Sequence, residues 1–345
     1  MSRVSIVVPI FNGAKYLRSL QTYFSRQTYR DCEILLIVSS KSTDGSYTEA
    51  NKLFGDVEGC RVILYEDVDS LGGSKNKGLD NATGDYIWFM DVDDFASDHF
   101  LEELVKIKEE NSADIVACNF VYSHNDMPFD EYPGRFPVKV LTSSEALRAR
   151  VDGKFPVTSW SMLYDLPFLK DHGLRFESGL AEDIVFTYTA LSLSSKVCYY
   201  PKPLYKYRIN YSSVCNSSAT RDIRAETEVR RFETLDKLFE SDRYMRRMFC
   251  LYRVRSAGHM TYRSFRRYIK GPEVKNAVQK CREPWVRFEF GVARWLSPLY
   301  FAAIRLFFRI IYYRSGKTYT PMERESHDDS RKSPTNEGGK ENGPA

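Results

Sequence analysis

Short runs of consecutive apolar residues alternate with polar turns and helix-like spacing over about the first 120 residues. Each run has the length of a β-strand. Runs that are apolar at nearly every position are typical of parallel strands covered by helices on both faces. They occupy residues 4–8, 34–38, 62–65, 86–90 and 115–117. The pattern therefore predicts an α/β fold with a mostly parallel sheet flanked by helices.

The polar segments that follow these strands are the first place to search for chemistry. In open α/β sheets, ligands bind at the carboxyl ends of the strands. The segments that follow Val8, Val38, Tyr65 and Met90 are polar and distinctive. We therefore expect candidate site residues in these loops.

The next segment has mixed secondary structure. Residues 121–140 contain three prolines and a glycine and are expected to leave the sheet. Helices are predicted over 143–151, 167–172 and 182–193, and short strands over 197–199 and 204–207. The domain is expected to close near residue 215.

The C-terminal part has helical and strongly basic character. Residues 219–268 are predicted to form two helices, which end at Gly271-Pro272. In residues 285–313 an arginine face lies opposite an apolar face. The arginines are Arg287, Arg294, Arg305 and Arg309, and the apolar residues are Phe290, Leu299, Ile304, Phe308 and Ile311. This pattern predicts an amphipathic surface and not a membrane-spanning helix. Its alternatives are a helical pair packed on the catalytic domain and a homodimer contact.

Four parts follow from these patterns. Residues 1–215 form the main domain, with a first half over 1–120 and a second half over 121–215. Residues 216–270 form a helical extension, and 271–317 form basic amphipathic helices that we expect to act as a membrane-surface anchor. Residues 318–345 have almost no apolar side chains and are expected to be disordered.

Composition narrows the class of protein. With 345 residues, of which 43% are hydrophobic and 14% aromatic, the chain is not wholly disordered, collagen-like or a disulfide-stapled miniprotein. The seven cysteines form no C-x-x-C pair, so reduced thiols are expected. The apolar run that begins near Val4 is too short for a signal peptide. We therefore expect a cytoplasmic location.

Charge is unevenly distributed along the chain. The net charge is +4, but it divides into about −7 for residues 1–220, about +13 for 221–317 and about −2 for the remainder. Nucleic acid, anionic lipid and simple solvation all fit such a basic segment. The aromatic residues lie opposite the arginines instead of between them, so nucleic-acid binding is not expected.

Asp91 and Asp93 give the strongest chemical signal, because they directly follow the apolar run over 86–90. Carboxylates at positions i and i+2 after a strand suit a hard divalent cation, Mg²⁺ or Mn²⁺, whose other positions remain open to phosphate oxygens. By themselves the residues also fit an Asp-rich helix start, with Asp93 or Asp94 as the N-cap.

The motifs in their order resemble the inverting GT-A glycosyltransferases of family 2, which use nucleotide-diphosphate sugars. In the first half these are VSIVVPIFN at 4–12, EILLIV at 33–38, STDGS at 42–46, GGSKN at 72–76, ATGDY at 82–86 and the aspartates. In the second half WSMLY at 160–164, GLRF at 173–176, the Glu182-Asp183 pair and PLYKYR at 203–208 resemble bacterial capsule and exopolysaccharide members. The resemblance covers about residues 3–213.

The resemblance implies roles for individual residues. Asp93 is the expected metal ligand, and Asp91 is expected to contact the ribose or the metal. Asp183 is the expected general base, which removes the proton of the acceptor hydroxyl. Without the family pattern, Glu182 and Asp183 would fit an acidic helix start better than a catalytic site. The expected donor contacts are Pro9, Phe11, Ser40, Asp44, Lys75, Asp91 and Arg208.

Several of these assignments have alternatives. Trp160 and Glu182 are expected to contact the acceptor, but a lone tryptophan fits a core position equally well. Lys75 fits a phosphate contact or a solvated surface position, and Arg208 fits a diphosphate clamp or a structural ion pair. Asn76 and Gly78 are expected to shape a turn before the next helix.

The sequence also departs from the family pattern. Ser39, Ser40 and Lys41 stand where two aspartates and a glycine are common, Lys75 replaces the usual arginine, and Ser161-Met162 replace a common Asn-Lys. A serine hydroxyl makes a weaker bond to a nucleoside than a carboxylate, by about 1 to 2 kcal/mol. The identity of the donor base is therefore open. No Gln-x-x-Arg-Trp segment is present, so a processive synthase is not expected.

The sequence therefore predicts metal-dependent, inverting transfer of a sugar from a nucleotide-diphosphate sugar, with a UDP-sugar favoured, to a hydroxyl of a glycan or lipid-linked acceptor. The expected setting is cell-surface polysaccharide synthesis at the inner face of the membrane. The alternative is a degenerate binding protein that keeps the fold and partners an active glycosyltransferase.

Overall fold

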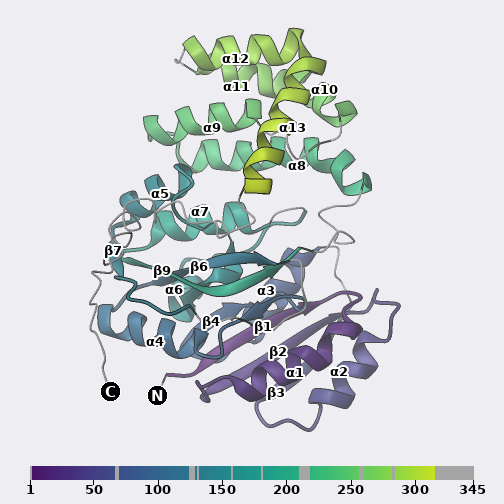
Figure 1. Cartoon of the computed structure of the whole chain (residues 1–345), viewed down its shortest axis with the longest axis vertical. Coiled ribbons are helices and arrows are strands. Elements are labelled where there is room, and N and C mark those ends of the chain that lie inside the picture. Colours follow the sequence, from purple (N-terminus) through teal and green to yellow (C-terminus); the bar gives the residue numbers. More distant parts are fainter. Residues whose placement is uncertain are drawn as a thin grey trace, which may run out of the picture.

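The computed structural model describes residues 2–66, 70–123, 129, 132–156, 158–179, 182–209, 218–255, 260, 262–281 and 284–314. Within these ranges the side chains of 218–224, 305 and 307–314 are not described. The predicted tail over 318–345 lies outside the described residues. In Figure 1 a sheet with its helices forms one end of the molecule, and the C-terminal helices stack at the other end.

A nine-stranded sheet is the centre of the main domain. Its order is β3 (Cys60–Tyr65), β2 (Cys32–Ser39), β1 (Val4–Ile10), β4 (Tyr86–Phe89), β8 (Met162–Asp165), β6 (Ile115–Ser123), β9 (Val197–Arg208) and β5 (Phe95–Ala96), and β7 (Lys139–Leu141) pairs with β9. The first four strands in this order are parallel. β8 runs antiparallel to both of its neighbours, so the sheet is mixed.

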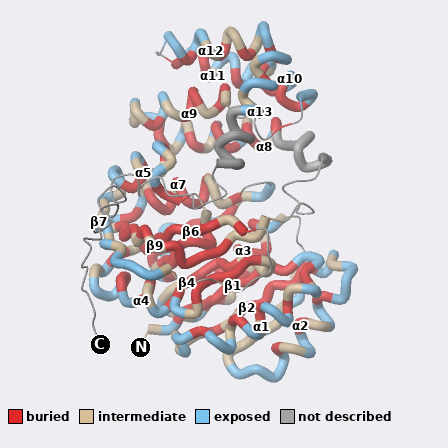
Figure 2. The backbone as a smooth tube through the Cα atoms, viewed as in Figure 1, coloured by how far each residue is buried: buried red, intermediate tan, exposed pale blue. Residues whose placement is uncertain are grey.

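Helices cover both faces of this sheet. On one face lie α1 (Leu17–Arg26), α2 (Ser46–Phe54) and α4 (Phe100–Asn111). On the other lie α3 (Leu71–Asn81), α5 (Ser143–Val151), α6 (Leu166–Asp171) and α7 (Asp183–Leu193). The strands between these two layers are largely buried, except for β3 and β7, whose residues are half-buried or exposed (Figure 2). Burial on both faces explains the continuous apolar runs and confirms the predicted α/β class.

Strand β9 joins two segments that were predicted as separate strands. It passes Pro201 and Pro203 through a shift of register against β6, on both sides of Asn119. Proline has no N–H to donate to a β-ladder, so a strand accommodates it at an irregularity. β9 therefore continues as far as Arg208, beside the candidate site.

Helix α3 corrects the expectation that Asn76 and Gly78 form a turn, because both lie inside the helix. A Cβ atom on Gly78 would lie 2.1 Å from the Val7 side chain, and one on Gly72 would lie 2.3 Å from the Glu177 carbonyl oxygen. Glycine is disfavoured in helices, but here it permits the close approach of α3 to its neighbours.

Six helices form the C-terminal extension. They are α8 (Ser218–Leu238), α9 (Arg243–Arg255), α10 (Tyr262–Lys270), α11 (Pro272–Lys280), α12 (Pro284–Trp295) and α13 (Ser297–Arg314). Three of them occupy the segment that was predicted as two helices. The main domain has one hydrophobic core on each face of its sheet, and the extension has a separate core, which we call the third core. Residues from both predicted segments, 216–270 and 271–317, contribute to this third core. None of the helices described is both long enough and apolar enough to cross a bilayer.

The extension also contacts the main domain directly. Phe232 and Phe249, from α8 and α9, pack in the same core as α7. The Thr234 hydroxyl donates a hydrogen bond to Glu177, at 3.3 Å. A cavity of about 60 Å³ beside Glu182 is lined by residues of the 177–185 segment and of α8. The extension therefore supports the segment that leads to Asp183.

Candidate active site

Asp91 and Asp93 lie in the turn that directly follows β4, as predicted. The alternative interpretation of Asp93 or Asp94 as an N-cap is wrong, because β5 intervenes and the N-cap of α4 is His99. A Cβ atom on Gly13 would lie 3.2 Å from the Val92 side chain, so the loop after β1 packs against this turn. The ends of β1 and β4 thus form one continuous surface.

Asp94 is a functional candidate that the sequence reasoning did not select. Its buried carboxylate accepts hydrogen bonds from the Tyr205 hydroxyl at 2.9 Å and from the Arg208 backbone N–H at 2.7 Å. The Tyr205 hydroxyl in turn accepts the Asp91 N–H at 3.4 Å. Burial, together with the charges of Asp93 and Asp91, raises the pKa of Asp94 well above its ordinary value. Asp94 therefore connects the end of β9 to the turn that carries Asp91 and Asp93, which we call the aspartate turn.

A buried ion-pair cluster joins α3 to the start of α7. The Lys75 ammonium group lies 2.7 Å from Asp183, 2.8 Å from Glu182 and 3.1 Å from the Ser159 hydroxyl. Asp183 also accepts the Ser159 N–H at 3.1 Å and the Ser159 hydroxyl at 2.9 Å. Only 1% of the Lys75 side chain is exposed, so a solvated surface lysine is excluded.

Electrostatic interactions link this cluster to Asp91 in the turn after β4. Loss of water raises the pKa of Asp91 to about 7; Lys75 opposes this shift, whereas Asp183 and Asp93 reinforce it. Burial acts to lower the pKa of Lys75, but the carboxylates of Asp183, Glu182 and Asp91 raise it well above its ordinary value. Asp91, one of the two carboxylates expected to hold the metal, and Asp183, the expected base, therefore interact with the same lysine.

Asp183 and Glu182 differ in their protonation behaviour. Burial acts to raise the pKa of Asp183, but Lys75 and the Ser159 hydrogen bonds outweigh it and hold this pKa below its ordinary value. Burial raises the pKa of Glu182, and the neighbouring charge of Asp183 adds to the shift. Asp183 is therefore the more acidic carboxyl group of the pair. Both residues also begin α7, with Glu182 as its N-cap, so the helix-start interpretation holds as well.

The loops after β1 and β2 are joined by hydrogen bonds. Asn12, at a positive φ of 49°, accepts the Thr43 N–H at 2.8 Å. Asp44 accepts the Ala14 N–H at 2.9 Å and the Ser46 N–H at 3.1 Å. A slight loss of water acts to raise the pKa of Asp44, but the bonds from Ser46 and Ala14 hold it below its ordinary value. The Asp44 carboxylate therefore shapes the two loops.

The predicted donor contacts from these loops differ in exposure. Pro9 is buried at the end of β1, whereas Phe11 is 53% exposed beyond it. Ser39 is buried and Ser40 is exposed. The Ser40 N–H donates to the Tyr65 carbonyl at 3.0 Å. Phe11 and Ser40 are thus accessible to a ligand, and their donor roles stay predictions.

Arg208 lies at the end of β9, where Asp94 holds its backbone. Its guanidinium group lies 5.0 Å from the centre of the Tyr16 ring and 4.8 Å from that of Phe95. Cation–π contacts of this kind hold an arginine in place without neutralising its charge. Arg208 is therefore positioned beside the aspartate turn, where a diphosphate contact remains a prediction.

Trp160 lies deeper than an acceptor contact requires. Its ring is only 4% exposed and stacks on Tyr205 at a centroid distance of 4.4 Å, with Phe120 at 4.7 Å. Its carbonyl oxygen accepts the Trp88 indole N–H at 2.7 Å. This is the environment of a core residue, and the acceptor role of Trp160 stays a prediction. The stacked Trp160 ring helps to hold Tyr205 in place, and the Tyr205 hydroxyl donates a hydrogen bond to Asp94.

The chemistry of the donor set fits a hard divalent cation. Carboxylate oxygens of Asp91 and Asp93 are suitable ligands, and Mg²⁺ is commonly held by one or two carboxylates together with substrate phosphates. Among the described residues, no group of three or more His, Cys, Asp or Glu side chains forms a metal site by itself. The residues thus fit an ion that the substrate helps to hold.

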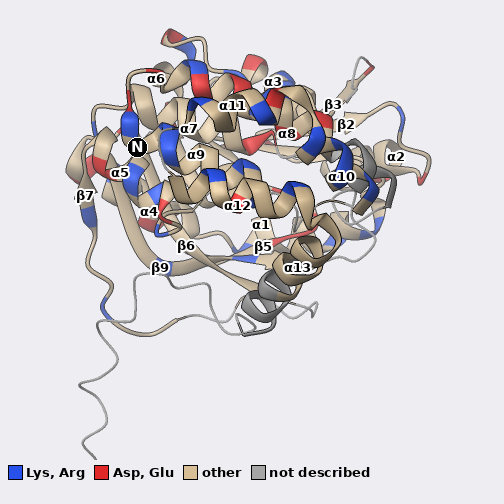
Figure 3. Ribbon diagram, turned by 90° about the horizontal axis from the view of Figure 1, so that it is seen from above, with Lys and Arg blue, Asp and Glu red and all other residues tan. Residues whose placement is uncertain are grey.

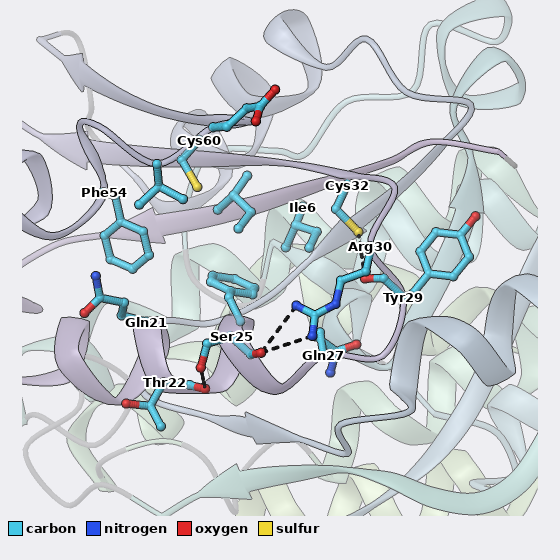
Figure 4. Close-up of a pocket in the computed structure, with 14 residues that line it drawn as sticks. Ile6, Gln21, Thr22, Ser25, Gln27, Tyr29, Arg30, Cys32, Phe54 and Cys60 are labelled. Carbon is cyan, nitrogen blue, oxygen red and sulfur yellow. Dashed lines mark hydrogen bonds between the residues drawn. The ribbon is translucent and has the colours of Figure 1, made fainter.

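A separate cavity of about 540 Å³ lies at the end of the strands that is opposite to the aspartate turn (Figure 4). Its lining includes Cys32 and Cys60, the first residues of β2 and β3, together with Phe24 and Phe54. The only carboxylate in this lining is that of Glu58. This cavity therefore lacks the features of the donor site.

Comparison with known proteins identifies the family of this chain. The family model "Glycosyl transferase family 2" matches residues 5–167. Glycosyltransferase GlyG of Streptococcus pneumoniae is 30% identical over 232 residues, which cover 64% of this chain and 76% of that protein. The chain belongs to glycosyltransferase family 2. The resemblance inferred from the motifs is thereby confirmed.

Other members of the family are longer or more distant. Glycosyltransferase GlyA of S. pneumoniae is 31% identical over 227 residues, which cover 61% of this chain. The chain spans only 31% of GlyA. It spans 62% of EpsH, a putative glycosyltransferase of Bacillus subtilis that is 27% identical over 225 residues.

Two solved structures share the architecture. Residues 1–349 of Staphylococcus aureus TarS, in complex with UDP-GlcNAc, match with a TM-score of 0.65 at 17% identity, over 92% of this chain and 93% of that one. The mannosyltransferase PcManGT from Pyrobaculum calidifontis, in complex with GDP-Man and Mn²⁺, matches with a TM-score of 0.50 at 15% identity, over 85% and 87% of the chains. The match to TarS covers 92% of this chain and therefore extends well beyond residue 215. The structural similarity thus includes much of the helical extension.

Proposed function

We propose that this chain transfers a sugar, with inversion, from a nucleotide-diphosphate sugar to a hydroxyl of a glycan or lipid-linked acceptor. The donor is a UDP-sugar and the sugar is of the hexosyl or N-acetylhexosaminyl type. One observation carries the proposal: the buried Lys75 ammonium group contacts Asp183 at 2.7 Å and also interacts with the charge of Asp91, which follows β4.

The reaction is a single displacement at the anomeric carbon. Asp183 accepts the proton of the acceptor hydroxyl while the acceptor oxygen forms the new glycosidic bond. The bond between the anomeric carbon and the diphosphate oxygen breaks on the opposite face, and its electron pair leaves with the nucleoside diphosphate. Attack from one face and departure from the other invert the configuration.

Lys75 has two tasks in this proposal. In the structure it keeps Asp183 ionised and fixed by a 2.7 Å contact. Its ammonium group is also close enough to Asp91 to interact with its charge, so a diphosphate bound there attracts the lysine away from Asp183. Such a partial transfer would raise the pKa of Asp183 and make it a stronger base once the donor is in place.

Asp91 and Asp93 are proposed to hold Mg²⁺ or Mn²⁺. When bound, the cation would neutralise charge on the diphosphate leaving group. The complex of PcManGT with GDP-Man and Mn²⁺ and that of TarS with UDP-GlcNAc support this proposal by analogy of fold. Arg208 is proposed to add a cationic contact to the diphosphate, and Glu182 to contact the acceptor.

The test is release of nucleoside diphosphate from a panel of UDP- and GDP-sugars with Mg²⁺ or Mn²⁺ and with chelator. Asp183→Asn is expected to lose activity at least about a hundredfold, as is typical when an acid–base group is removed. Asp93→Ala is expected to lose activity because a proposed ligand of the cation is removed. Glu58→Gln, an exposed carboxylate far from the site, is the control. Asp183→Asn should still bind UDP with metal, which separates loss of chemistry from loss of binding. Full activity in both site variants would overturn the proposed mechanism.

A second function is supported by the loop after β2. Ser39 and Ser40 supply no carboxylate for the nucleoside, and the Asp44 carboxylate is engaged by the neighbouring loop. These features fit a GT-A-fold binding protein that has lost its donor and assists an active glycosyltransferase. Calorimetry distinguishes the two: binding of UDP or GDP with metal supports the enzyme, and absence of binding by either supports the scaffold. In both cases the proposed location is the cytoplasmic face of the membrane.

A further inference from the structure

Helices α12 and α13 leave several large apolar side chains in water. At the end of α12 and the start of α13, Trp295 is 84% exposed, Leu296 is 53% exposed and Leu299 is 70% exposed. Phe288, two turns before Trp295, is 75% exposed. We call these four residues the apolar corner. Trp285 and Leu306 extend it along the two helices, with 39% and 58% exposed.

This exposure is not explained by poor packing of the two helices. Their other faces are docked in the third core, where Val286, Ala293 and Phe301 are at most 8% exposed. The Phe265 ring of α10 stacks on Phe301 at 5.5 Å. A surface helix that packs on one face is normally polar on the other. A cluster of exposed apolar side chains therefore marks an interaction surface.

The apolar residues that the sequence predicted on one face over 285–313 differ in burial in the structure. Phe290 and Leu299 were both placed on that face, but Phe290 is buried in the third core and Leu299 is exposed. The helices therefore pack against the extension and still present an apolar face outward. Phe308 and Ile311 lie outside the described side chains.

The surroundings of the apolar corner are strongly basic. Residues 243–314 contain seventeen Lys and Arg and three Glu and no Asp. Helix α10 packs beside α12 and α13 and exposes Arg263, Arg266, Arg267 and Lys270. In the view from above, Lys and Arg mark α10 and α12 (Figure 3). A partner of this surface must therefore combine apolar material with negative charge.

We propose that the apolar corner inserts into the interface of an anionic lipid bilayer while the basic residues of α10 bind the headgroups. Tryptophan, leucine and phenylalanine beside arginine and lysine are typical of segments that lie in a membrane interface. Each basic residue near an anionic surface adds attraction that salt weakens. This surface is separate from the active site, so the proposal does not depend on the transfer reaction.

Two other occupants fit the chemistry less well. A second copy of this chain would bring two surfaces of the same positive charge together, at an electrostatic cost. A nucleic acid would satisfy the arginines but would leave Leu296 and Leu299 in water, because phosphates do not cover aliphatic side chains. Of these three occupants, an anionic bilayer is the one that supplies both components in one surface.

The test is flotation of the full chain with vesicles of phosphatidylcholine alone and with added phosphatidylglycerol. The double variant Trp295→Ser, Leu299→Ser removes the most exposed part of the apolar corner. Its matched control, Val140→Ser with Leu193→Ser, removes two exposed apolar side chains of the main domain, which are 53% and 41% exposed. Size-exclusion chromatography with light scattering measures the oligomeric state of every variant.

The expected result is binding to the anionic vesicles that falls with added salt and is at least about tenfold weaker in the apolar-corner variant, since two large apolar side chains no longer enter the interface. The control variant should bind as the wild type does. Quenching of tryptophan fluorescence by brominated acyl chains should also fall in Trp295→Phe.

Three results would overturn the proposal. The first is equal flotation of the apolar-corner variant and the wild type. The second is no flotation together with a dimer that the apolar-corner variant converts to monomer, because a second copy would then cover this surface. The third is binding of RNA but not of vesicles.

Discussion

The Lys75 ammonium group lies 2.7 Å from Asp183 and 2.8 Å from Glu182, in a site where the lysine is almost completely buried. One buried cation thus faces two carboxylates that open α7, and interacts with the charge of Asp91 beyond them. Removing one member of such a cluster leaves uncompensated buried charge. The fold and the proposed chemistry therefore depend on the same side chain.

Lys75→Ala is expected to lower the free energy of unfolding by about 3 to 5 kcal/mol, because two buried carboxylates lose their cation. Activity should fall more than this loss of stability explains, since Asp183 is no longer held. Urea unfolding and nucleotide release measure the two effects separately.

Lys75→Arg is the matched control, because it keeps the charge in a side chain with a different shape. It should recover most of the stability that Lys75→Ala loses. If Lys75→Ala proves as stable as the wild type, the buried ion pair does not stabilise the fold in the way described.

Asp94 is predicted to act as a positioning residue for the end of β9. Asp94→Asn and Tyr205→Phe each disturb the 2.9 Å bond between these side chains. We expect a coupling energy of about 1 to 2 kcal/mol in a double-mutant cycle of unfolding, since the two substitutions remove one shared interaction. The affinity for UDP with metal should fall in Asp94→Asn if Arg208 loses its position. Strict additivity of the two substitutions would contradict the role.

Much of the fold follows from local pattern. The apolar runs locate β1, β2, β3, β4 and the start of β6, and α5 has the bounds that its spacing predicts. β1, β2, β4 and β6 are largely buried on both faces, and α5 has a capping box at Thr142 and Glu145. β3 is only half-buried, although its apolar run also predicts it. Local sequence therefore determines them with little help from the rest of the chain.

Other features depend on contacts between distant segments. Helix α3 is glycine-rich, and the reason for its glycines is its close approach to Val7 and Glu177, which lie on distant segments. The contact of Lys75 with Asp183 joins residues 108 positions apart. In the sequence, Asp94 looks like an ordinary acidic residue of a turn. Its role becomes visible only in the fold, where Tyr205 of β9 donates a hydrogen bond to it. No periodicity or spacing carries this information, which is why the sequence indicated the aspartate turn but not the network around it.

We predict that Glu33 contributes to the change of the free energy of unfolding with pH at acidic pH. Burial acts to raise the pKa of this carboxyl, but hydrogen bonds from Ser5 and Thr83 and the charge of Arg61 hold it below its ordinary value. A carboxyl with a depressed folded pKa contributes stability above its unfolded pKa of about 4.3, and loses it as the pH falls through the folded value. Glu33→Gln should therefore be less stable than the wild type at pH 7, and this difference should shrink as the pH falls below about 4.

Urea unfolding at pH 7, 5, 4 and 3.5 measures this prediction on both proteins. The exposed Glu58→Gln serves as control and should follow the wild type at each pH. A constant difference between Glu33→Gln and the wild type over the whole range would show that the ionisation of Glu33 does not contribute.

Gly78 and Gly291 are predicted to respond in opposite directions to the same substitution. Both lie within helices, α3 and α12, and alanine is favoured over glycine in a helix by about 1 kcal/mol. At Gly291 nothing lies within 4 Å of an added Cβ atom, so Gly291→Ala should raise the free energy of unfolding by about 0.5 to 1 kcal/mol. At Gly78 the Cβ atom would lie 2.1 Å from the Val7 side chain of β1, so α3 must move.

Movement of α3 would carry Lys75 away from Asp183, because both the close contact and the lysine lie on this helix. Gly78→Ala should therefore lose at least about 1 to 3 kcal/mol of stability, as overpacking does, and should lose activity as well. Thermal unfolding and nucleotide release on both variants measure the contrast. If Gly78→Ala were as stable and as active as Gly291→Ala, α3 would not be held against β1 as described, and the position of Lys75 would have to rest on other contacts.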